Sequence, residues 1–89
     1  MNINIKHLEY ILEIYRQKSI NKAAKALFIS QPNLSRIVRE LEQELGFEIM
    51  TRDRSGLAFN QQGLYLVDYA EKIIREAKNI ENIPSMLSN

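Results

Sequence analysis

The chain has 89 residues, enough for one hydrophobic core but not for two sizeable ones. It contains no cysteine, which excludes disulfide scaffolds, thiol catalysis and cysteine-based zinc sites and agrees with a reducing compartment. The net charge is only +1, and no segment has the length of a membrane span or the pattern of a signal peptide, so we expect a soluble cytoplasmic protein.

The charges nearly cancel overall, but they are segregated along the chain. Residues 16–39 include six basic side chains and no acid, whereas residues 40–51 include four glutamates and no base. A basic region beside an acidic one provides an oriented docking surface for a polyanion. The alternative for either region alone is an ordinary solvated helix face.

Two helices are predicted in the first third of the chain. Asn4 can cap a helix that runs to about Gln17, with an inner face formed by Leu8, Ile11, Leu12 and Tyr15. Asn21 can cap a second helix of about two turns, KAAKALF, whose alanines allow another helix to approach closely. The single histidine, His7, has no second histidine or cysteine with which to hold a metal, so we predict no metal site.

Residues 29–46 carry the clearest helix signals of the chain. Ser30 can cap the helix, Pro32 fits its first turn, and Gly46 suits a left-handed end. Only Ile29 and Ser30 separate this helix from the preceding one. Two helices joined by so short a turn meet at a sharp angle, as in a helix-turn-helix.

The same helix has two distinct faces at 100° per residue. The inner arc is wholly apolar and consists of Leu34, Ile37, Val38, Leu41 and Leu45. The outer arc has no acid in its first two turns and consists of Pro32, Ser35, Arg36 and Arg39, with Gln31 at its edge. The inner arc predicts a core contact, and the grouping on the outer arc predicts a binding face rather than scattered surface residues.

The helical period stops after Gly46, and a hairpin is predicted. Residues 47–49 and 57–59 are short β-compatible segments on either side of the sequence RDRSG at 52–56. The turn is expected near Ser55 and Gly56.

A long final helix is predicted over residues 61–82. Asn60 can cap it, and Pro84 is expected to end it because a proline disfavours helix at the preceding residue, Ile83. One apolar stripe holds Leu64, Val67 and Ile74 and can close the core.

A second stripe on this helix has near-heptad spacing. It would be exposed in a monomer and so predicts a twofold dimer, with interface residues Leu66, Ala70, Ile73, Ala77 and Ile80. The alternative is that both stripes belong to one intramolecular core.

One set of residues, spread over almost the whole chain, forms a pattern of residue types at fixed spacings: Ser19, Ala23, Ala24, Leu27, Ser30, Gln31, Pro32, Leu34, Ser35, Arg36, Ile37, Leu41, Glu42, Leu45, Gly46, Arg52 and Gly56. Together they resemble the DNA-binding domain of the LysR-type transcriptional regulators. The resemblance implies a mainly α fold: a winged helix-turn-helix over residues 1–60, with three helices and a short β-hairpin wing, then a linker and dimerisation helix over 61–83. Residues 84–89 would lead into an effector domain outside this chain, and the alternative is a free-standing short regulator.

The resemblance also implies which residues contact DNA. The helix after Ser30 would enter the major groove, Gln31 and Pro32 would read base edges, and Ser35, Arg36 and Arg39 would hold the backbone. On the wing, Arg52 would meet phosphate and Arg54 a flanking minor groove, although Arg52 could instead pair with Asp53. The implied DNA-binding residues are Asn21, Gln31, Pro32, Asn33, Ser35, Arg36, Arg39, Arg52 and Arg54. Asn33 departs from the small residue more frequent in the family.

We therefore predict sequence-specific binding of double-stranded DNA by a homodimer on an interrupted palindrome. A small-molecule effector would act only through a domain outside this chain. The alternative is a winged-helix protein-interaction module, because a fold does not dictate its function. No residues resemble a nucleophile with its base or a nucleotide site, so we predict neither an enzyme nor a cofactor.

Overall fold

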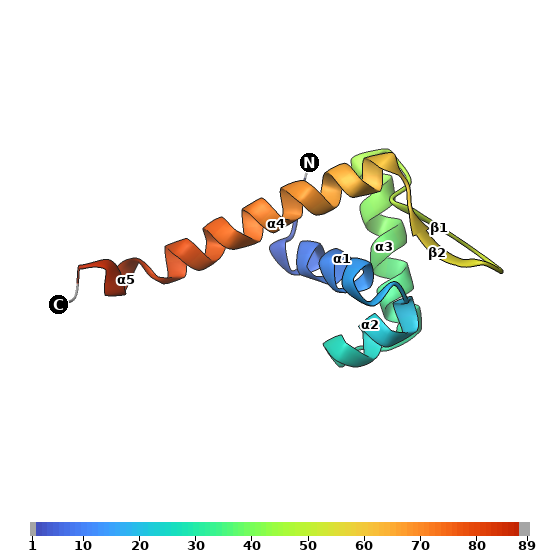
Figure 1. Cartoon of the computed structure of the whole chain (residues 1–89), viewed down its shortest axis with the longest axis horizontal. Helices are drawn as coiled ribbons and strands as arrows, with labels where there is room; N and C mark the ends of the chain where they lie inside the picture. Colours follow the sequence, from blue (N-terminus) through green and yellow to red (C-terminus); the bar gives the residue numbers. More distant parts are fainter. Residues whose placement is uncertain (1, 88–89) are drawn as a thin grey trace.

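The computed structural model describes residues 2–87 and has the predicted mainly α winged helix-turn-helix fold (Figure 1). The helices and strands are α1 Ile5–Gln17, α2 Ile20–Leu27, α3 Gln31–Leu45, β1 Met50–Asp53, β2 Gly56–Phe59, α4 Gln61–Glu81 and α5 Ile83–Met86. In Figure 1, α4 crosses α1 and extends far past it, on the side opposite to the projecting wing of β1 and β2. The molecule is therefore elongated, with extents of 55 × 27 × 20 Å.

Most helix ends follow the predicted capping residues. The Asn4 side chain accepts the Lys6 N–H, Ser30 accepts the Asn33 N–H, and Asn60 accepts the N–H of Gly63. Gly46 ends α3 in the left-handed conformation, with φ of 84°. These ends were predictable because each depends on one side chain and the local backbone.

The cap of α2 was predicted wrongly. Ser19, not Asn21, precedes the helix, and its hydroxyl accepts the Lys22 N–H at 3.1 Å. An earlier start brings Ile20 into the helix, where its side chain is buried in the core. Asn21 instead lies exposed in the first turn.

The core lies between the first three helices and the near half of α4. Its buried apolar residues include Leu8, Ile11, Ile14, Ala23, Ala24, Leu34, Ile37, Val38, Leu41, Ile49, Met50, Val67 and Ala70. Two predicted inner residues, Leu12 and Leu45, are half-buried at its edge. Tyr15 was expected inside but is 39% exposed, and it packs edge-to-face on Phe59 of the wing, with ring centroids 5.2 Å apart.

The first strand of the wing starts at Met50 rather than at Phe47. The Ile49 backbone is engaged elsewhere: its N–H donates to the Glu42 carboxylate at 2.8 Å, and its carbonyl accepts the Asn60 N–H at 3.1 Å. From Met50 the strands pair antiparallel, with Met50 opposite Phe59 and residue 53 opposite residue 56. A two-residue turn at positions 54 and 55 closes the hairpin.

The long helix ends one residue earlier than predicted and is followed by a further short helix. Asn82 separates α4 from α5, in which Ile83 is helical and Pro84 occupies the first turn. Pro84 therefore interrupts the helix without abolishing helical structure beyond it, since a proline is tolerated at a helix start. Within residues 2–87, no helix is both long and apolar enough to cross a membrane.

The face of α4 that meets the core differs in part from the prediction. Ala70, assigned to the exposed stripe, is fully buried, and Leu66 packs partly against the core. Leu64, assigned to the core stripe, is exposed. As predicted, Val67 is buried and Ile73 and Ile80 are exposed, and Tyr65 and Tyr69 join the exposed stripe. The helix is thus rotated about its axis relative to the two stripes that the spacing predicted.

Candidate nucleic-acid interface

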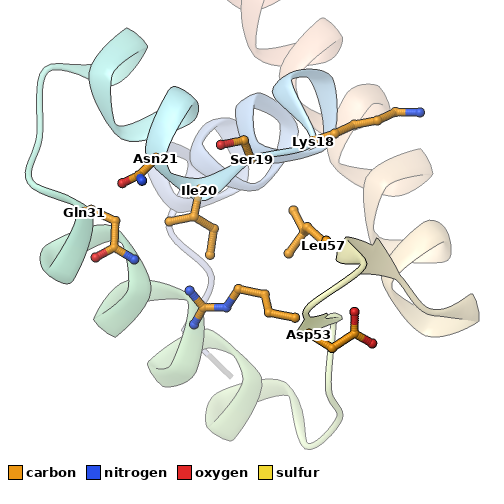
Figure 2. A pocket seen from close by; sticks show the side chains of 9 residues that line it. Lys18, Ser19, Ile20, Asn21, Gln31, Asp53 and Leu57 are labelled. Atoms are coloured by element: carbon orange, nitrogen blue, oxygen red, sulfur yellow. The ribbon is translucent and has the colours of Figure 1, made fainter.

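An open groove of about 300 Å³ lies between the start of α2, the first turn of α3 and the wing (Figure 2). Figure 2 shows Asn21 and Gln31 on its helical side and Asp53 and Leu57 on its wing side. The lining residues are Lys18, Ser19, Ile20, Asn21, Gln31, Arg52, Asp53, Gly56 and Leu57. The fold thus brings together three of the predicted DNA-binding residues, Asn21, Gln31 and Arg52, from three different elements.

Gln31, Pro32 and Asn33 form the exposed start of α3. Pro32 is exposed, and the other two side chains are half-buried. The Gln31 amide donates from Nε2 to the Ser35 hydroxyl at 2.8 Å. Its Oε1 and second hydrogen remain for a partner in the groove.

Ser35 does not lie on the outer surface, where it was predicted. The residue is 6% exposed, and among residues 2–87 it is the one polar residue that is buried. Its hydroxyl lies beneath Gln31 and Arg52, and the Arg52 Nη1 approaches its Oγ at 3.4 Å. The helical period placed Ser35 on the correct arc, but the side chains of Gln31 and Arg52 lie over its hydroxyl.

Arg36 is exposed and already held by two neighbours. Its guanidinium donates to Glu40 Oε1 at 2.7 Å and to the Asn33 amide oxygen. An exposed pair of this spacing contributes only about 0.3–0.5 kcal/mol, so a polyanion can displace it. Arg39, one turn later, is exposed and has no ion-pair partner within residues 2–87.

Both wing arginines are exposed, and the alternative pairing of Arg52 with Asp53 is not observed. The Asp53 carboxylate instead accepts the Ser55 hydroxyl and the Ser55 N–H. These hydrogen bonds, the hydroxyl first and then the amide, lower the pKa of Asp53 below its usual value, so it remains charged at neutral pH. Asp53 therefore closes the turn, and Arg52 is directed towards α3.

The groove also contains residues that the sequence did not single out. Lys18 lies at its rim in the left-handed conformation, with φ of 54°, at the end of α1. Its place within the basic stretch 16–39 was the available signal. Arg36, Arg39 and Arg54 lie outside the groove lining, so the predicted set extends over a wider face than the groove itself.

Comparison with known proteins gives a family match and several relatives. Residues 5–64 match the family described as bacterial regulatory helix-turn-helix protein, lysR family. The hydrogen peroxide-inducible genes activator of Haemophilus influenzae is 37% identical over 83 residues, which cover 93% of this chain and 28% of that protein. The DNA-binding transcriptional dual regulator OxyR of Escherichia coli is 36% identical over 83 residues, covering 93% of this chain and 27% of that protein. The chain therefore spans little more than a quarter of these relatives.

Among solved structures, the crystal structure of the BenM_DBD/catB site 1 DNA complex superposes on this chain with a TM-score of 0.89. The sequence identity is 28%, and the match covers 98% of each chain. The similarity therefore includes the wing and the long helix as well as the first three helices.

Proposed function

Because the chain belongs to the lysR family of bacterial regulatory helix-turn-helix proteins, we propose that it is the part of a transcriptional regulator that binds double-stranded DNA by sequence. The observation that supports this most directly is the convergence of Gln31 from α3 and Arg52 from the wing on one open groove. A donor and acceptor at a helix start can read a base edge, and a flanking arginine can hold phosphate. The resemblance to a protein solved with DNA supports the same proposal.

Each predicted contact has a distinct role in this proposal. Gln31 and Pro32 read bases in the major groove, while Asn33 and Asn21 lie beside them. Arg36, Arg39 and Arg52 hold the backbone, and Arg54 at the wing turn reaches a flanking minor groove. Ser35, because it is buried, is assigned no direct contact with DNA.

We also propose the larger organisation that the family implies. Residues 1–60 form the DNA-binding unit, residues 61–83 the linker and dimerisation helix, and residues 84–89 lead towards a domain that senses a small effector. The regulator acts in the cytoplasm, as a homodimer on an interrupted palindrome whose halves are about 34 Å apart. The family is one of regulators, and we propose neither catalysis nor a cofactor for this chain.

Fluorescence anisotropy titrations of labelled duplexes should distinguish the residues that read bases from those that bind the backbone. Arg36→Ala should weaken binding to preferred and scrambled duplexes alike and reduce the salt slope by about 1, because one phosphate contact is lost. Gln31→Ala and Pro32→Ala should mainly lose discrimination, with Gln31→Ala costing about 1–3 kcal/mol on the preferred duplex only. Affinities equal to the parent in all three variants would refute the assignment. A protein-interaction module would show no salt-dependent binding to either duplex.

Glu40→Gln is expected to strengthen DNA binding about 2–5-fold. The substitution releases Arg36 from its ion pair and removes one negative charge from the binding face, a combined effect on the order of 0.5–1 kcal/mol. Glu71→Gln is the matched control, because it removes the same charge from an exposed position on α4. If both variants gained the same DNA affinity, the effect would be due to net charge rather than to the release of Arg36.

A further inference from the structure

The Ser35 hydroxyl joins the two elements that form the groove. Gln31 Nε2 lies 2.8 Å from its Oγ, and Arg52 Nη1 lies 3.4 Å from the same atom, across 17 positions of sequence. A hydroxyl oxygen has two lone pairs, so it can accept from both donors at once. The contact from the wing is long by ordinary standards and is therefore the weaker of the two.

The two donors depend on this one acceptor. Within residues 2–87, Ser35 is the hydrogen-bonding partner of both the Gln31 amide nitrogen and the Arg52 guanidinium. Asp53 does not compete for Arg52, because its carboxylate accepts hydrogen bonds from Ser55. The orientation of both groove side chains is therefore set from beneath by a residue that is itself 6% exposed.

We infer that Ser35 is a positioning residue that fixes the amide of Gln31 for base reading and couples it to the wing through Arg52. This inference rests on the proposed DNA-binding function. With Nε2 turned towards Ser35, Gln31 presents Oε1 and its second N–H to the groove. That pair of groups matches N6 and N7 of adenine, so the buried hydroxyl selects the amide orientation that can read this base. Arg52, held by the same oxygen, is brought next to the backbone beside that base pair.

The first test is Ser35→Ala, titrated on a preferred and a scrambled duplex. Affinity for the preferred duplex should fall about 10-fold and affinity for the scrambled one less than about 3-fold, because the base contact loses its orientation while every charge remains. For the same reason the salt slope should stay at the parent value, whereas Arg52→Ala should lower it by about 1. The Tm should fall by no more than about 8 °C, since both freed donors can reach water.

The second test is a double-mutant cycle on the same duplexes. Once Gln31→Ala has removed the amide, adding Ser35→Ala should cost no further discrimination, because the positioned group is gone. Ser35→Thr, which retains the hydroxyl, should keep the discrimination of the parent at a Tm that shows a folded protein. Additive losses in the cycle, or equal losses on the two duplexes by Ser35→Ala, would overturn the inference. If the parent itself does not distinguish the two duplexes, the proposed function fails instead.

Discussion

Replacing Gly63 by alanine should destabilise the domain by about 3 kcal/mol, the upper end of the usual cost of overpacking a core. A Cβ built on Gly63 would lie 2.0 Å from the Ile49 carbonyl oxygen and 3.0 Å from its carbonyl carbon. These are backbone atoms, and the carbonyl is held in place by the Asn60 N–H. Neither partner can rotate away, so α4 would have to move off the connection between α3 and β1.

The expected change in the free energy of unfolding has the opposite sign to that of a glycine-to-alanine substitution at an ordinary helical position. Gly63 lies inside α4, where alanine normally stabilises a helix by about 1 kcal/mol. Thermal unfolding followed by circular dichroism should instead show a Tm about 12–24 °C lower. Gly46→Ala is the control, since Gly46 has positive φ and open space around it and should lose only about 1–2 kcal/mol of backbone energy. A Tm for Gly63→Ala at or above that of the parent would contradict the close contact.

The helix-turn-helix could be predicted from sequence because its signals are local. Ser30, Pro32 and Gly46 each act within one turn of the chain, and they fixed both ends of α3. The prediction of the α2 cap was wrong because the local signals alone do not decide it. Ser19 and Asn21 are both good capping residues, and the burial of Ile20, a tertiary effect, selects between them.

The composition of the groove could be predicted only in part, because it depends on the placement of the wing. Spacing assigned Ser35 to the outer arc of α3, but only the fold shows that Arg52 reaches over it. Spacing likewise could not choose which side of α4 faces the core. In the structure, Gly63 lies close to the Ile49 backbone, Ala70 on the same side of α4 is buried, and Tyr65 is left exposed.

The rotation of α4 also defines the surface on which a dimer would form. Ile73 is 40% exposed and Ile80 is 66% exposed, and they line an open, mainly apolar groove of about 370 Å³ together with Ile5, Ala77, Lys72 and Glu76. Tyr65 and Tyr69 continue the same stripe, and within residues 2–87 no element other than α5 lies against the part of α4 beyond α1 (Figure 1). Exposed apolar surface of this extent is typical of an interface, which supports the proposed homodimer through α4.

Ile73→Glu is expected to convert the dimer to a monomer and to weaken binding to a two-half-site duplex by about 100-fold or more. The glutamate would bring two like charges into the apolar centre of the interface, and loss of the dimer removes the effective concentration that links the second half-site to the first. Sedimentation would measure the mass, and anisotropy the affinities for one and two half-sites. Asn79→Glu is the matched control, because it adds the same charge to an exposed position of α4 about 120° away. The one-half-site affinity of Ile73→Glu should equal that of Asn79→Glu, and a dimeric Ile73→Glu protein with parental binding to the full site would refute this interface.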